Sequence, residues 1–330
     1  MKIASITPIR YFYNKDGKLF RDLERLESQI VSLKSQNGIG RKFALDIYIG
    51  DATHNKDICK KIMNICKKHG AIYKKISRSD FFNRGLLIND TVKQVAACDE
   101  LLLLDLDLIL DPNLISKFLE YRKTKDYLRV FLAGINFVSI DKFDLSKNKV
   151  SKELLKHQIK SQVNRFNTAN GLQFIQYKEF MNFGGLDINF NAYCGTDDEI
   201  LFRMNNYRSP GYVPKNFLPT KRAEFCINSF NEPLAFHLNH DMGTAAMASK
   251  SYENKDNAFR QLLCKVNRAY LKNYIGTSKY KIQNNLNKNL NYLCKKDGMF
   301  YWGNENEVIL REGQINAKSL LDQYIKNRDM

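Results

Sequence analysis

The sequence predicts an α/β protein with a doubly wound mixed sheet flanked by helices, and with a helical C-terminal extension. Strand-like and helix-like apolar patterns alternate along the first third of the chain, as they do in βαβ units. One run, Leu101 to Leu104, is continuously apolar, which is typical of a strand buried on both faces of a sheet. Ligands of such sheets bind outside the carboxyl ends of the strands, so the residues after Leu104 are candidates for a binding site.

Each element follows from a local pattern. Within 17–34, apolar residues recur at helical spacing at Leu23, Leu26, Ile30 and Leu33. Short apolar runs closed by turn-forming residues predict strands. The expected strands are 2–6, 43–49, 71–76, 101–105, 129–137 and 172–177. The other expected helices are 55–69, 83–97, one that begins near 113 and, in the tail, 259–270 and about 317–326.

The chain has 330 residues and a formal net charge of +17, which suits an anionic partner: nucleic acid, a membrane surface or a small substrate. Its most lysine-rich stretch, 56–78, alternates with isoleucines and is interpreted as the solvated face of an amphipathic helix. The alternative is a patch that faces a membrane or a phosphate. No run approaches the roughly 20 apolar residues of a membrane helix.

Residues 1–8 lack the pattern of a signal peptide. The seven cysteines form no Cys-x-x-Cys pair, which argues against a zinc knuckle and for reduced, buried thiols. We therefore expect a cytoplasmic protein, with peripheral contact at the anionic inner face of the cytoplasmic membrane as an option.

Asp105 and Asp107 stand on alternate positions directly after the apolar strand. Two carboxylates at such a place are costly unless something compensates their charge. A turn or a helix N-cap would explain them, because Asp111-Pro112-Asn113 follows closely. Alternatively, their oxygens are ligands of a hard divalent cation, which would neutralise a bound diphosphate.

A second acidic cluster, Asp197-Asp198-Glu199, follows Gly195-Thr196. Adjacent acids require a cation, a basic partner or solvent, and they also suit the first turn of a helix. The two interpretations are compatible, because a carboxylate fixed at a helix start is a well-held general base. Such a base suits removal of a proton from an attacking hydroxyl group.

His237 and His240 form a third cluster, three residues apart. An imidazole could complete a metal shell that otherwise consists of oxygen, and the alternative is two histidines at the surface or the core edge. Arg84 follows Phe82-Asn83 ahead of an expected helix. It belongs to a helix cap or binds a phosphate or a uracil edge through its guanidinium fork.

Together these segments resemble the GT-A glycosyltransferases, and most closely the β-1,4-galactosyltransferase and bacterial chondroitin-polymerase branch next to glycosyltransferase family 2. The resemblance covers about residues 2–245 and lies in the order of the segments. That order is Thr7-Pro8-Ile9-Arg10, Phe82-Asn83-Arg84 with Leu86-Leu87-Ile88-Asn89, Asp105-Leu106-Asp107, Phe183-Gly184-Gly185-Leu186-Asp187 and Gly195-Thr196-Asp197-Asp198-Glu199-Ile200-Leu201-Phe202-Arg203.

The resemblance implies a GT-A catalytic domain over 1–250, with a nucleotide-sugar half (about 1–112) and an acceptor half (about 113–250), followed by the helical extension 251–330. It implies that Asp105 and Asp107 hold Mn²⁺ or Mg²⁺. His237 or His240 would complete the metal shell, and His237 is favoured because it ends an apolar run.

The resemblance also implies roles for residues around the acidic cluster. Asp197 matches the catalytic base when the register is set from Arg203, although Thr196 replaces a usual Glu and another register would make Asp198 the base. Glu199 matches an acid that touches sugar hydroxyls, and Tyr193 falls where related enzymes stack a tryptophan on a sugar. The residues implied to bind the nucleotide-sugar are Pro8, Arg10, Asp51, Arg84, Asp105, Leu106, Gly184 and Gly185.

The implied activity is an inverting transfer of a hexose or N-acetylhexosamine from a UDP-sugar to a saccharide or lipid-linked saccharide acceptor. The Asn- and Lys-rich, Pro-poor composition is typical of an AT-rich bacterial genome and suggests synthesis of surface polysaccharide or lipooligosaccharide. The alternatives are a nuclease-like, metal-dependent phosphate-processing enzyme and a basic nucleic-acid-binding protein. No recognisable nucleic-acid-binding motif occurs, so we expect no nucleic-acid partner.

Overall fold

The computed structural model describes residues 1–11, 23–76, 84–122, 127–132, 167–168, 171–182, 185–186, 226–227, 235–237, 294–296 and 299–301. The chain divides into two compact units. Unit 1 comprises Met1–Ile76, Asp90–Glu179 and Asn216–Asp241. Unit 2 comprises Ser77–Asn89, Phe180–Lys215 and Met242–Met330.

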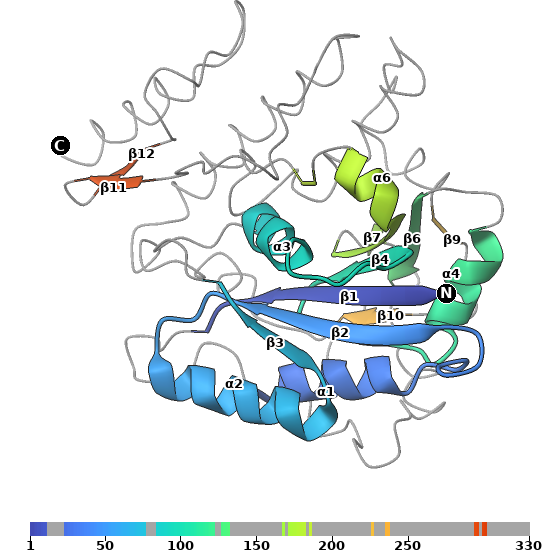
Figure 1. Cartoon of the computed structure of the whole chain (residues 1–330), viewed down its shortest axis with the longest axis horizontal. Helices are drawn as coiled ribbons and strands as arrows, with labels where there is room; N and C mark the ends of the chain where they lie inside the picture. Colours follow the sequence, from blue (N-terminus) through green and yellow to red (C-terminus); the bar gives the residue numbers. More distant parts are fainter. Residues whose placement is uncertain are drawn as a thin grey trace, which may run out of the picture. The chain divides into compact units, whose positions relative to one another are not determined.

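Unit 1 is built on a mixed sheet (Figure 1). Its strands are β1 (Lys2–Ile9), β2 (Ala44–Asp51), β3 (Ile72–Lys75), β4 (Glu100–Leu104), β6 (Tyr127–Leu132), β7 (Asn167–Thr168), β8 (Leu172–Gln176) and β9 (Cys226–Ile227). Their order is β3-β2-β1-β4-β8-β6-β7, and β9 pairs with β6. Neighbours from β3 to β4 are parallel, whereas β8 is antiparallel to both β4 and β6.

Helices cover both faces of this sheet. The helices of the described chain are α1 (Leu23–Lys34), α2 (Lys56–His69), α3 (Arg84–Val92), α4 (Leu114–Tyr121) and α6 (Tyr177–Asn182). Side chains alternate between the faces of a strand. Ile47 and Ile49 of β2 join the core with α1 and α2, whereas Tyr48 accepts a hydrogen bond from the backbone of Ala96, after α3. The predicted α/β class with a doubly wound mixed sheet is therefore confirmed.

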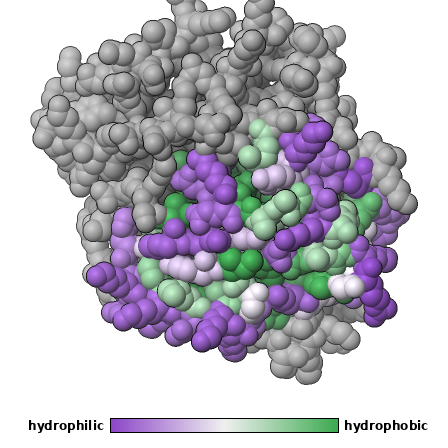
Figure 2. Space-filling view, viewed as in Figure 1, coloured by the Kyte–Doolittle hydropathy of each residue, from purple (hydrophilic) through white to green (hydrophobic). Residues whose placement is uncertain are grey.

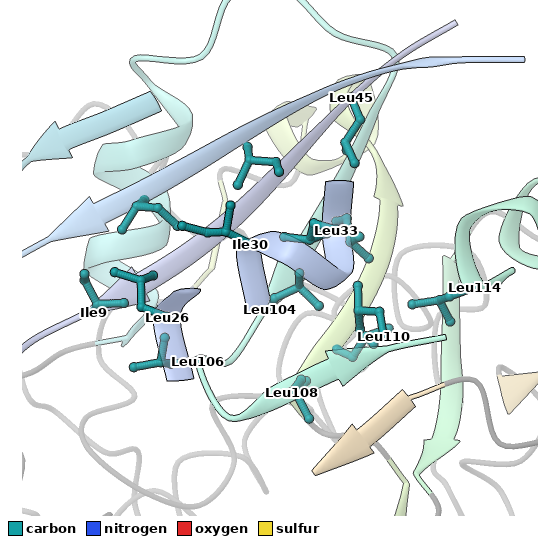
Figure 3. Packing of buried hydrophobic residues seen from close by; sticks show 14 of the residues in the cluster. Ile9, Leu26, Ile30, Leu33, Leu45, Leu104, Leu106, Leu108, Leu110 and Leu114 are labelled. Carbon is teal, nitrogen blue, oxygen red and sulfur yellow. The ribbon is translucent and has the colours of Figure 1, made fainter. Parts of the chain in front are cut away.

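Strand β4 lies in the middle of the sheet, between β1 and β8. Its residues Leu101 to Leu104 are all 0% exposed, as the continuous apolar run predicted. Figure 3 shows the side chains of α1, among them Leu26, Ile30 and Leu33, against Leu104 and the chain that follows it. The same core fixes the path of the chain where β4 ends.

Strand and helix lengths differ from the sequence prediction at some ends. β1 extends beyond residue 6 because its pairing with β2 continues to Ile9. Pro8 is tolerated there because β4 pairs with β1 only as far as Ile6, so one side of the strand has no ladder to interrupt. Helix α3 ends at Val92, followed by turn bonds from Gln94 to Thr91 and from Val95 to Val92.

Helix α2 has the predicted amphipathic form. Asn55 caps its first turn by accepting bonds from the backbone of Asp57 and Ile58, and Gly70 ends it in a left-handed conformation. Its buried residues are Ile58, Ile62 and Cys66. Its lysines are exposed, and Figure 2 shows hydrophilic residues gathered over this helix.

Within the described residues, no helix is long and apolar enough to cross a membrane. Cys59, Cys66 and Cys98 are free thiols there, and burial raises the pKa of Cys66 to about 12. In unit 2, β11 (Cys294–Lys296) and β12 (Met299–Tyr301) form an antiparallel pair. The helices expected at 259–270 and 317–326 lie outside the described residues, so the helical extension and the domain boundaries stay predictions.

Candidate functional site

The two aspartates predicted as metal ligands lie at the carboxyl end of the central strand. Asp105 directly follows β4, and Asp107 directly precedes β5 (Leu108–Leu110). Asp105 is partly exposed and Asp107 is 6% exposed. Residues 106–107 form a turn, so both carboxylates belong to one short segment between two buried strands.

Gly171, just before β8, lies against the Asp105 side chain. Its carbonyl accepts the backbone N–H of Asp105 at 2.8 Å. A Cβ added to Gly171 would lie 2.5 Å from Cγ of Asp105 and 2.8 Å from its Cβ. Only a residue without a side chain therefore leaves room for the Asp105 carboxylate in this position.

Leu106, predicted to bind the nucleotide-sugar, has its side chain in the core. It is 4% exposed and belongs to the same apolar cluster as Leu26 and Ile9 (Figure 3). A ligand contact by Leu106 would therefore come from its backbone. Burial of this side chain anchors the turn between the two aspartates.

The ends of β1 and β2 lie side by side at the same edge of the sheet. Pro8 pairs with Gly50 and Ile9 with Asp51, and the backbone of Ala52 donates to the carbonyl of Ile9 at 3.0 Å. Arg10, which follows β1, is 8% exposed. The structure thus brings the predicted Pro8, Arg10 and Asp51 together at one edge.

Asp51 is fully buried, and its carboxylate is bonded within the fold. Oδ1 accepts the backbone N–H of Thr53 at 2.7 Å, and Oδ2 accepts the hydroxyl of Tyr73 at 2.7 Å. Lys75 lies 3.8 Å from Oδ2 and donates to the carbonyl of Thr53. Burial, and then the bond to Asp51, raise the pKa of Tyr73, so its hydroxyl stays a donor. Asp51 therefore shapes the loop after β2.

His237 is the last residue of β10 (Ala235–His237), which runs antiparallel to β5. In this register His237 is opposite Leu108, the residue after Asp107. The backbone of the predicted histidine ligand therefore lies next to the acidic turn. His240 lies outside the described residues, and the structure describes His237 through its backbone alone.

In unit 2, Arg84 begins α3 and is 6% exposed. Asn89, one turn later in the same helix, bonds to the backbone of Leu186 with both ends of its amide. Nδ2 donates to the Leu186 carbonyl at 2.8 Å, and Oδ1 accepts the Leu186 N–H at 2.9 Å. Gly185 has φ +76°, and a Cβ there would lie 2.5 Å from Oδ1 of Asn89. Two of the segments on which the resemblance depends are therefore in contact, one through Asn89 and the other through Leu186.

The remaining predicted site residues lie outside the described residues. They are Gly184, Tyr193, Asp197, Asp198 and Glu199. Among the side chains that the structure describes, no three potential metal ligands lie together. The described donor set still fits a hard divalent cation, because two carboxylates on one turn supply oxygen ligands and the lack of a side chain at Gly171 makes room for the Asp105 carboxylate itself.

Three residues that hold the described site segments in place were given no role from the sequence: Gly171 and Gln29, which contact Asp105, and Asn89, which was quoted only within a motif segment. Gln29 is 0% exposed on α1 and donates to the carbonyl of Asp105. A signal for it was available, since Gln29 lies three residues after Leu26 and so on the buried stripe of the helix. Gly171 gives a turn signal, but nothing in the neighbouring sequence predicts that this glycine lies against Asp105.

Comparison with models of protein families and with curated proteins gives no match. Among solved structures, the chain is similar to the mannosyltransferase PcManGT from Pyrobaculum calidifontis in complex with GDP-Man and Mn²⁺ (TM-score 0.46, 10% identity, 82% of this chain and 62% of that one). It is also similar to S. aureus TarS 1-349 in complex with UDP (0.43, 11%, 82% and 71%). A further similar structure is glucosyl-3-phosphoglycerate synthase from Mycobacterium tuberculosis in complex with UDP (0.41, 9%, 83% and 80%).

The chain spans less than two thirds of the length of the mannosyltransferase. With TM-scores below 0.5 and identities of 9% to 11%, these likenesses carry no argument about the activity or the ligands of this chain. The observations that bear on function are therefore those of the site itself.

Proposed function

We propose that this chain is a metal-dependent glycosyltransferase of the GT-A type, which moves a hexose or N-acetylhexosamine from a UDP-sugar to a saccharide or lipid-linked saccharide acceptor. The observation that carries the proposal is the position of Asp105 and Asp107 after the central buried strand, beside the pairing of His237 with Leu108. Carboxyl ends of strands in an open α/β sheet are where nucleotides bind.

In this proposal the described residues bind and orient the donor. Asp105 and Asp107 would hold Mn²⁺ or Mg²⁺, with His237 or His240 as a further ligand. When bound, the cation would neutralise negative charge on the departing diphosphate. Pro8 and Arg10 line the edge where the nucleotide would lie, and Asp51 holds the shape of the adjoining loop through Thr53 and Tyr73.

Arg84, Gly184 and Gly185 are proposed as further donor contacts, because a guanidinium binds phosphate oxygens and glycines let a ligand approach the backbone. Glu199 and Tyr193 would touch the sugars.

The transfer needs a base, and Asp197 or Asp198 would accept the proton of the acceptor hydroxyl as it attacks the anomeric carbon. The bond between that carbon and the UDP oxygen then breaks, with inversion of configuration. Positioning and charge stabilisation would supply most of the rate.

The test is the affinity for UDP with and without Mn²⁺, measured by calorimetric titration. Wild-type protein should bind UDP at least about tenfold more tightly with Mn²⁺, about 1.4 kcal/mol. Changing Asp105→Asn together with Asp107→Asn keeps the shape of both side chains and should abolish this difference. Asp46→Asn together with Asp57→Asn is the matched control, since both of these carboxylates lie in unit 1 at a distance in the chain from the turn.

Undiminished Mn²⁺-dependent UDP binding in the Asp105/Asp107 double variant would sink the proposal. Metal-dependent cleavage of oligonucleotides without turnover of any UDP-sugar would instead favour the nuclease-like alternative. A screen of UDP-sugar hydrolysis with Mn²⁺ identifies the donor. Synthesis of a surface polysaccharide or lipooligosaccharide is the pathway that we propose for the product.

Contact with an anionic membrane belongs to the same proposal, since a lipid-linked acceptor lies at a membrane surface. The exposed lysines of α2 support it, because basic residues near anionic lipid add about 1 kcal/mol each. Cosedimentation with anionic liposomes at low salt measures this contact, and its absence there would remove this part of the proposal.

A further inference from the structure

Helix α1 buries a row of polar side chains, which we call the α1 polar row: Gln29, Ser32 and Gln36. They are 0%, 3% and 4% exposed, respectively. Spacings of three and four residues place them on one side of the helix. Buried polar groups need hydrogen-bond partners. The partners here are backbone groups of the segment 105–115, which contains the acidic turn.

Gln29 binds the two ends of the acidic turn. Its Nε2 donates to the carbonyl oxygen of Asp105 and to that of Leu108, the latter at 3.3 Å. These two carbonyls flank Leu106 and Asp107. One amide group therefore joins both ends of the segment that carries the aspartates.

Thr7 of β1 binds the other end of the Gln29 amide. Carbonyl oxygens only accept hydrogen bonds, so the NH₂ end of the amide must face Asp105 and Leu108. The Oε1 end then faces Thr7, whose hydroxyl donates to it at 2.9 Å. Because Thr7 is 0% exposed, water does not compete for this bond.

The rest of the α1 polar row binds farther along the chain. Ser32 Oγ accepts the N–H of Leu110 at 3.3 Å. Gln36 donates to the carbonyl of Asp111 at 2.7 Å and accepts the N–H of Ile115 at 3.1 Å. Gln36 thus makes the same kinds of bond as Gln29, from the same helix, but beyond the acidic turn. It provides a matched control.

We propose that Gln29 is a positioning residue for the metal-diphosphate site: it fixes the backbone on both sides of Leu106-Asp107 and so sets the directions of the Asp105 and Asp107 carboxylates. This inference rests on the proposed function. A metal site depends on its ligands being held within about 0.5 Å of their binding geometry. Loss of a group that orients metal ligands weakens metal affinity by about 10- to 100-fold.

The experiment compares Gln29→Met with Gln36→Met, since methionine has a similar length but cannot donate to a carbonyl. Mn²⁺ affinity is measured directly by titration in the presence of UDP. UDP affinity without metal and the urea midpoint of unfolding are measured on the same samples. Both variants should lower the unfolding midpoint. Only Gln29→Met should weaken Mn²⁺ binding, by about 10- to 100-fold, with metal-free UDP affinity unchanged.

Thr7→Val provides a second variant if Gln29→Met does not fold, because it replaces only the hydroxyl that donates to the amide oxygen of Gln29 by a methyl group. It should weaken Mn²⁺ binding in the same direction. Equal Mn²⁺ affinities in wild type, Gln29→Met and Thr7→Val would overturn the inference. So would equal losses in Gln29→Met and Gln36→Met.

Different results would contradict the proposed function and the role of Gln29. If wild-type protein binds no Mn²⁺ with UDP, the proposed function and the inference both fail. If wild type binds Mn²⁺, and Asp105→Asn with Asp107→Asn abolishes that binding while Gln29→Met does not alter it, the inference alone fails.

Discussion

Replacing Gly171 by alanine would place a methyl group against the Asp105 carboxylate. The added Cβ would lie 2.5 Å from Cγ of Asp105, whereas ordinary contacts begin at 3.4 Å. The carboxylate must therefore move by about 1 Å, because the Gly171 carbonyl also binds the Asp105 backbone and so limits movement of the chain. Overpacking of this size costs about 1–3 kcal/mol.

A displacement of about 1 Å also takes the Asp105 oxygens away from a bound cation. We expect Gly171→Ala to weaken Mn²⁺-dependent UDP binding by about 10- to 100-fold, as for other changes that misplace a metal ligand. Calorimetric titration of UDP with Mn²⁺ measures the binding, and urea unfolding measures stability. The two measurements separate a local displacement from general destabilisation.

Gly40→Ala is the control for destabilisation alone. Gly40 has φ +77° with no atom within 4 Å of an added Cβ, so alanine there strains the backbone by about 1 kcal/mol without touching Asp105. It should lower stability and leave UDP binding unchanged. Binding of UDP and Mn²⁺ by Gly171→Ala as tight as that by wild type would show that the Asp105 carboxylate is not held against Gly171 during binding.

Two further predictions concern stability. Asn89→Ala leaves the buried N–H and carbonyl of Leu186 without their amide partner and should cost about 1–3 kcal/mol in urea unfolding; an unchanged midpoint would contradict the bonding described. Hydrogen bonds from Lys68, and then from His69, hold the pKa of Glu27 below its ordinary 4.5. A lowered carboxyl pKa stabilises the fold above the unfolded value and stops doing so as pH falls through the folded value. Glu27→Gln should therefore cost about 0.2–1 kcal/mol at pH 7, and the difference from wild type should shrink as pH falls below 4.5 and vanish once pH is below the lowered folded pKa. A difference that persists at low pH would rule out this origin.

The sequence predicted the architecture of unit 1 well because the decisive signals are local. A continuous apolar run such as Leu101 to Leu104 is typical of a strand that is buried on both faces in the middle of a sheet. The residues after it then necessarily lie at the carboxyl edge, which is how Asp105 and Asp107 were found. The amphipathic pattern of α2 was equally direct, since Asn55 and Gly70 mark its ends.

The contacts that support the site could not be predicted from the sequence, because they depend on how segments far apart in the chain pair with one another. Gly171 reaches Asp105 only because β8 pairs antiparallel with β4 so that Leu172 is opposite Leu104. A one-residue slip would move every side chain of β8 to the other face. No local pattern states that register. The bond of Asn89 to the backbone near Gly185 likewise joins residues almost a hundred positions apart.

The α1 polar row has a consequence for how the protein folds. An apolar helix face can pack against a sheet in several positions shifted by one turn, about 5.4 Å apart, because leucines exchange contacts freely. Shifted by one turn, α1 would bring Leu33 to the carbonyls that Gln29 now binds, and each buried carbonyl left without a donor costs about 1–3 kcal/mol. The row therefore distinguishes the correct docking position from its neighbours by several kcal/mol, which the apolar contacts alone would not do. A designed variant with an all-leucine α1 face would leave these carbonyls without donors in every docking position, so it would lose stability as well as its preference for a single docked state.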